Sequence, residues 1–159
     1  MLTYHKFDAS PDDAWLALLN SAVVRKHLLQ HPRFTDDTIR VWIQDKLSQD
    51  LQPGCRIRAV HHDGKLAGWC GIQLECGNYE LAIVLAPVYW GYGREVMKQI
   101  KIWAQELGHK ELFAHLPSTR PQTKALARLL GQPVGTTSIQ DHVFNTYRIE
   151  IGSRSEHCK

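Results

Sequence analysis

The pattern of apolar and polar residues is clearest in the middle of the chain. Residues 81–86 form a short apolar run rich in β-branched side chains, which is typical of a strand that is buried on both faces. From residue 96 to residue 107 apolar side chains recur every three or four positions, as they do on the buried face of a helix. Gly108 follows, where a helix commonly ends in a left-handed residue. These residues predict a strand, a turn that contains Gly91 and Gly93, and a helix.

Two helices are expected near the amino terminus, after an alternating segment over residues 2–7 that predicts a first strand. Ser10 precedes Pro11 and two aspartates. Serine at the N-cap with proline at the first helical position is a common start of a helix. Thr35 precedes a second pair of aspartates, which predicts the start of the second helix for the same reason.

Strands on both sides of the central segment extend the predicted sheet. Residues 55–61 and 66–74 are expected to be strands joined by a tight hairpin at Asp63 and Gly64. Together with the central strand they should form an antiparallel meander. Residues 111–116 predict a strand parallel to the central one, because a helix lies between the two.

The last part of the chain predicts one more helix and the final strands. Ser118 or Thr119 is expected to cap a helix that Gly131 closes, and strands should follow around residue 139 and over residues 143–151. We therefore predict a single α/β domain over residues 1–152. Residues 153–159 are predicted to be a polar tail.

Composition narrows the class of protein. The chain has 159 residues, 43% of them hydrophobic and 22% charged, which suits one globular domain. Its formal net charge of +3 is too small to require a nucleic-acid partner. Four cysteines without a C-x-x-C pair predict reduced thiols and a cytoplasmic protein. No apolar run approaches the ~20 residues of a membrane span, and no histidine spacing indicates a metal site.

Gly91 and Gly93 suggest an anion-binding turn. A turn between a buried strand and a helix leaves the first helical N–H groups unpaired at the positive end of the helix dipole, and glycine lets a phosphate approach the backbone closely. The dinucleotide fingerprint does not fit, since the third glycine would fall on Val96, and the Gly-Lys-Ser/Thr of a P-loop is absent. The alternative is that the glycines serve only the geometry of the turn.

Residues 80–96 also carry a resemblance to a known family. Their sequence, ELAIVLAPVYWGYGREV, resembles the core motif of the GNAT superfamily of acyl-CoA-dependent N-acyltransferases. The motif is especially similar to that of the branch of ribosomal-protein alanine acetyltransferases. The resemblance implies a GNAT fold, with a mixed, mostly antiparallel sheet of six or seven strands and helices on both faces.

The same resemblance implies acetyl-CoA as the cofactor and coenzyme A as a product. The backbone amides of the glycine turn would bind the pyrophosphate, and the end of the central strand would pair with pantetheine and supply an N–H for the tetrahedral intermediate. The residues expected to bind the cofactor are Val84, Leu85, Ala86, Tyr89, Trp90, Gly91, Tyr92, Gly93, Arg94 and Glu95.

Acetyl transfer to an amine requires a base. An amine with a pKa of about 8 (α-amine) or about 10.4 (lysine) must lose a proton before it attacks a thioester. By resemblance Glu80 is the expected base, acting directly or through water. The family's leaving-group tyrosine has no counterpart on the helix after the fifth strand. Tyr147 and His115 are the candidate donors to the thiolate, which could also leave unassisted.

The predicted function is an N-acetyltransferase that moves acetyl from acetyl-CoA to a primary amine, on a small molecule or a protein N-terminus, by direct attack in a ternary complex. Two alternatives remain. Because the tyrosine is missing and the position of the family's asparagine falls on Pro121, the chain could be a non-catalytic acyl-CoA sensor. It could also be a nucleic-acid- or protein-binding module without cofactor. The expected oligomeric state is a monomer or a homodimer.

Overall fold

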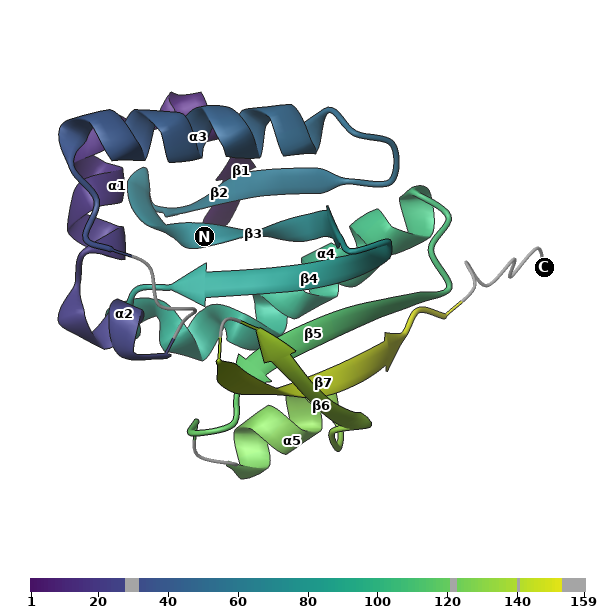
Figure 1. Ribbon diagram of the computed structural model, residues 1–159. Coiled ribbons are helices and arrows are strands. Elements are labelled where there is room, and N and C mark those ends of the chain that lie inside the picture. Colours follow the sequence, from purple (N-terminus) through teal and green to yellow (C-terminus); the bar gives the residue numbers. More distant parts are fainter. Residues whose placement is uncertain (28–31, 121–122, 140, 153–159) are drawn as a thin grey trace.

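A computed structural model describes residues 1–27, 32–120, 123–139 and 141–152 of the chain (Figure 1). Pro121 and the predicted tail at 153–159 lie outside these residues. The helices are α1 (Asp12–Leu19), α2 (Ala22–His27), α3 (Asp36–Asp50), α4 (Gly93–Glu106) and α5 (Lys124–Leu130), with 3₁₀ helices η1 (Phe7–Ala9) and η2 (Pro87–Tyr92). The strands are β1 (Leu2–His5), β2 (Arg56–His62), β3 (Lys65–Glu75), β4 (Asn78–Leu85), β5 (Glu111–Pro117), β6 (Gly135–Ile139) and β7 (His142–Glu150).

All seven strands form one mixed sheet in the order β1-β2-β3-β4-β5-β7-β6. Every neighbouring pair is antiparallel except β4 and β5, which are parallel because α4 connects them. The prediction of a mixed, mostly antiparallel sheet with the central strand in a meander is confirmed.

The sheet carries a hydrophobic core on each face. Ile100 of α4 and Leu130 of α5 belong to one buried cluster, together with Tyr147 of β7. Trp15 of α1 and Ile39 of α3 belong to the other. In Figure 1, α4 lies behind β4 and β5, on the face opposite the second cluster.

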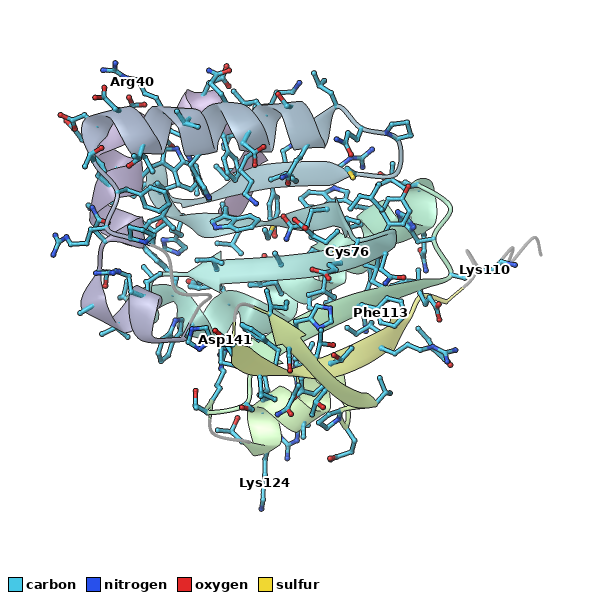
Figure 2. All side chains as sticks on the ribbon, in the orientation of Figure 1. Arg40, Cys76, Lys110, Phe113, Lys124 and Asp141 are labelled. Carbon is cyan, nitrogen blue, oxygen red and sulfur yellow. The ribbon has the colours of Figure 1, made fainter. Side chains whose placement is uncertain are left out.

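The junction between β4 and β5 is the weakest in the sheet. Glu80 is in register with Phe113 (labelled in Figure 2), and this is the single residue pair that joins the two strands within the described part of the chain. Beyond it, toward the carboxyl ends of both strands, β4 and β5 diverge (Figure 1). The backbone pairing of the sheet is therefore interrupted between Glu80 and the carboxyl end of β4, and we call this interruption the opening of the sheet.

Several local predictions are confirmed. Asp63 and Gly64 both have positive φ, 49° and 82°, as a two-residue type I′ hairpin requires. Gly108 is left-handed at φ 84° just after α4. The Thr35 side chain caps α3 by accepting a hydrogen bond from the N–H of Thr38.

Other local predictions are wrong. Ser10 does not cap α1, which begins at Asp12 after Pro11; the Ser10 hydroxyl instead contacts His61 Nε2 at 2.8 Å, inside the protein. Neither Ser118 nor Thr119 caps α5, whose cap is Thr123. Helix α1 thus begins without a side-chain cap because Ser10 is engaged elsewhere, whereas α5 uses a different threonine from the one expected.

Among the described helices, none combines the length and the apolar character needed to cross a bilayer.

Candidate active site

The opening beside β4 exposes a small set of backbone groups. Backbone groups of a strand point alternately to its two neighbours. The N–H of Ala86 donates to the carbonyl of Ala67 on the β3 side at 2.9 Å, and the backbone groups of Val84, two residues earlier, point to the same side. Leu85 lies between them, so its N–H points to the other side, into the opening toward β5. Of the three residues expected at this place, Leu85 is the one that offers its N–H to a ligand there.

The predicted anion-binding turn is the 3₁₀ helix η2 followed directly by the first turn of α4. Gly93 is the first residue of α4 and has φ −54° and ψ −39°, a conformation open to any residue. Neither Gly91 nor Gly93 has a positive φ, and a Cβ added to either would meet no protein atom within 4 Å. The geometry of the turn therefore does not require glycine at these positions.

What glycine does provide here is unobstructed access to backbone N–H groups at a helix N-terminus. This arrangement fits a phosphate group, which would occupy the space that two Cβ atoms would otherwise fill. Arg94 and Glu95 follow in the first turn of α4, and both are exposed. The Arg94 guanidinium can approach an anion, whereas Glu95 can contribute only its backbone N–H.

Side chains of η2 anchor this turn to the sheet. The indole Nε1 of Trp90 donates to the carbonyl of Leu85 at 2.9 Å. The hydroxyl of Tyr92 lies 2.9 Å from His62 Nε2, and the Tyr89 ring packs against the same histidine with ring centroids 5.3 Å apart. These three aromatic residues therefore position the backbone of the turn. His62 was not predicted, because no local sequence signal connects the end of β2 with η2.

Glu80 and His115 are in direct contact across the junction of β4 and β5. Glu80 Oε1 lies 2.8 Å from His115 Nε2, and the two side chains are 18% and 16% exposed. Burial raises the pKa of the Glu80 carboxyl above its ordinary value, the neighbouring His115 lowers it, and the charge of Glu75 raises it. A carboxylate with a raised pKa is a stronger base than a solvated one.

The sequence predicted Glu80 and His115 for separate roles, and the structure brings the two side chains into contact. Glu80 shares its face of β4 with Val84, which packs into the cluster of α1 and α3, so the pair lies on the face opposite α4. Phe113, two residues before His115, lies on the same face (Figure 2).

Tyr147 is not part of this pair. Its side chain is 1% exposed and belongs to the core cluster of α4 and α5. It neighbours Ala114 in register, so it points to the face opposite His115. In the mechanism proposed below, Tyr147 has a packing role and no proton-transfer step.

A family model with the description "Acetyltransferase (GNAT) domain" matches residues 2–132. Structural similarity extends over nearly the whole chain. A ribosomal-protein-alanine N-acetyltransferase from Brucella melitensis superposes with a TM-score of 0.70 at 16% identity, covering 94% of this chain and 99% of the other. An N-acetyltransferase from Staphylococcus aureus Mu50 gives 0.69 at 16% identity, covering 96% and 98%.

A third similar structure is that of the protein yncA from Salmonella typhimurium with its cofactor acetyl-CoA. It gives a TM-score of 0.69 at 13% identity and covers 98% of this chain and 95% of the other. At these identities the structures show a shared fold. No curated protein sequence matches the chain significantly. The family match, which covers most of the chain, and the shared fold agree: this chain belongs to the GNAT family and is an acetyltransferase that uses acetyl-CoA.

Proposed function

We propose that this protein transfers an acetyl group from acetyl-CoA to a primary amine by direct attack in a ternary complex, with the Glu80–His115 pair as the base. The observation that carries this proposal is the contact between Glu80 and His115, at 2.8 Å, at the point where β4 and β5 begin to separate. This contact supports a base at the start of an opening that offers unpaired backbone groups.

The coenzyme is held by the turn and by the open edge of β4. Backbone N–H groups around Gly91 and Gly93 receive the pyrophosphate, and Arg94 adds a positive charge. The unpaired backbone groups of β4 hold the extended pantetheine arm as a neighbouring strand would. The N–H of Leu85 stabilises the negative charge that develops on the thioester oxygen.

The proton of the amine leaves through the acid–base pair. Glu80 accepts it through water, because Glu80 and Leu85 lie five residues, about 16 Å, apart along β4. The amine nitrogen forms a bond to the acetyl carbon, and the carbon–sulfur bond then breaks. A thiol with an ordinary pKa near 8.5 is an acceptable leaving group as the thiolate, so the thiolate departs without a dedicated donor. This leaves His115 free to serve Glu80, and the sequence-based role of His115 as thiolate donor is replaced by that of partner to the base.

The acceptor is an amine, and a peptide with an amino-terminal alanine is the first one to test. The motif at residues 80–96 resembles the ribosomal-protein alanine branch, and the structure from Brucella melitensis is similar in fold. Fold alone does not determine the acceptor, so small primary amines belong in the same panel.

The role of Glu80 is tested by Glu80→Gln. Turnover, measured as release of coenzyme A, should fall about 100-fold or more, because general-base catalysis contributes about 10²–10⁴. Affinity for acetyl-CoA should stay within about twofold, since a neutral Gln still fits this position. Full turnover by the variant would remove Glu80 from the mechanism. Coenzyme binding without acetylation of any amine by the wild type would favour the sensor instead.

The placement of the coenzyme is tested by Gly93→Asp. Acetyl-CoA at a hundred times its dissociation constant should add about 2.7 kcal/mol to the stability of the wild type, roughly a 5 to 10 °C rise in melting temperature. In Gly93→Asp this rise should disappear, because a carboxylate would occupy the place of the pyrophosphate. Gly152→Asp is the matched control, since Gly152 is exposed and a Cβ there meets only Gln105 at 3.9 Å. A normal rise in Gly93→Asp would place the coenzyme elsewhere.

A further inference from the structure

A continuous row of hydrogen-bonded side chains crosses the carboxyl-terminal half of the sheet. Beyond the contact of Glu80 with His115 Nε2, the Nδ1 of His115 lies 3.0 Å from Thr146 Oγ1, which lies 2.7 Å from Thr137 Oγ1. The four residues belong to β4, β5, β7 and β6, which is the order of these strands in the sheet. Each contact therefore joins neighbouring strands, and the row runs from the base to the edge of the sheet.

The direction of each hydrogen bond follows from an ionised Glu80. A carboxylate only accepts hydrogen bonds, so Nε2 of His115 must donate to it. A neutral imidazole carries one proton, so Nδ1 must accept, and the hydroxyl of Thr146 is its donor. Because this hydroxyl has a single hydrogen, its contact with Thr137 requires Thr137 to donate.

Protonation of the His115 ring reverses the donor and acceptor roles in both hydroxyl contacts without moving a heavy atom. Both nitrogens of His115 then donate, so Thr146 accepts from Nδ1 and turns its own hydrogen toward Thr137. A hydrogen bond from a charged donor is stronger than one between neutral groups. The two hydroxyls thus give Nδ1 a hydrogen-bond partner in both protonation states of the ring.

We propose that Thr146 and Thr137 are positioning residues for the Glu80–His115 pair. They hold the neutral ring with Nε2–H toward Glu80, which keeps the carboxylate oriented, and they stabilise the ring when it carries a second proton. The catalytic meaning of this arrangement rests on the proposed function, whereas the hydrogen-bond pattern itself does not.

Other charged groups surround the row without joining it. Glu75 on β3 acts on Glu80 through its charge. Lys46 on α3 donates at 2.9 Å to Gln73, the neighbour of Glu80 in register. On β7, Arg148 pairs with Glu111 at 2.7 Å and with Glu150 at 3.6 Å, and His142 at the start of the strand is exposed. The sequence of β6, GTTSI, has no titratable side chain. Substitution of the two threonines leaves all these charges in place, so a change in titration reports on the hydroxyls.

The test is a pH titration of the ¹⁵N-labelled protein by NMR, with the ring nitrogens of His115 assigned through His115→Gln. In the wild type the neutral ring should be protonated at Nε2. Thr146→Val should lower the titration midpoint of the Glu80–His115 pair by about half a pH unit or more, because the charged ring loses its stronger hydrogen bond. Thr137→Val should lower it by a smaller amount.

Two controls separate this role from a merely structural one. Thr146→Ser keeps the hydroxyl and should titrate like the wild type. Thr136→Val changes an exposed threonine of β6, next to Thr137 but on the other face of the sheet, where it is in register with Asn145, and should also have no effect. A neutral ring protonated at Nδ1 in the wild type would overturn the inference, as would Thr146→Val and Thr137→Val titrating like the wild type. Full turnover of Glu80→Gln would instead count against the proposed function and leave the titration result standing.

Discussion

The central strand β4 has two edges that differ sharply. On the β3 side every residue of β3 from Gly68 to Glu75 has a partner in β4, and the backbones approach so closely that a Cβ on Gly68 would collide with the backbone of Val84. On the β5 side a single pair joins the strands. The same strand is therefore paired with a neighbouring strand along the whole of one edge and almost unpaired along the other.

This difference leaves main-chain atoms along one edge of the central strand without a neighbouring strand. An unpaired backbone group in a buried strand is costly unless something else pairs with it. The open edge of β4 is completed at its end by the Trp90 indole, which donates to Leu85, and elsewhere it is available to an extended ligand. The contact between Glu80 and His115 lies where the pairing of β4 with β5 stops.

The largest expected effect comes from closing the space on the tight edge. Gly68→Ala should destabilise the protein by about 3 kcal/mol, because the added methyl would force β3 and β4 apart, and thermal unfolding should move down by roughly 6 to 12 °C. Gly91→Ala is the control in η2, beyond the end of β4, where a Cβ meets nothing within 4 Å, and its unfolding temperature should equal that of the wild type. Equal stability of the two variants would contradict the comparison.

A smaller loss of stability should distinguish an ion pair in the amino-terminal half of the chain from one in the carboxyl-terminal half. In the amino-terminal half, Asp50 is 6% exposed and accepts from Arg58 at 2.6 Å and from the N–H of Ile57 at 2.8 Å. Asp50→Ala should therefore cost about 2 kcal/mol in urea denaturation, since it leaves partly buried donors unpaired. Glu111, paired with Arg148 at 43% and 50% exposure, should lose no more than about 0.5 kcal/mol on change to Ala. A larger loss at Glu111 would show that the second half depends on its surface charges.

The smallest effect is a pH dependence at the junction itself. Because burial raises the pKa of Glu80 above 4.5 in the folded protein, the native state holds this proton more tightly than the unfolded state does. The stability that results is present below pH 4.5 and is lost as the pH rises through the folded pKa. Between pH 4 and pH 8 the wild type should therefore lose stability relative to Glu80→Gln, when the unfolding free energies of both are measured by urea denaturation. A difference that does not change with pH would mean that the carboxyl is not desolvated.

The elements nearest the site were predictable because their signals are local. The apolar run of β4, the repeat along α4 and the left-handed Gly108 each depend on residues close in sequence, and the structure has all three. The motif at residues 80–96 indicated the family before any coordinates, and the family match agrees with it. Helix starts were less predictable: the Ser10 hydroxyl contacts His61 and caps no helix, and α5 uses Thr123 where Ser118 or Thr119 was expected.

By itself the sequence determined the α/β fold class and the glycine turn, since residue type and spacing carry that information. Glu80 became a candidate through the family resemblance, and His115 because the family's leaving-group tyrosine has no counterpart. Only the tertiary structure decided that Glu80 and His115 form one pair, that Tyr147 is packed in the core, and that Thr146 and Thr137 extend the pair to the sheet edge. These contacts depend on strand order and register across four strands. Order and register are set by how the whole sheet packs against its helices, and no short stretch of sequence encodes them.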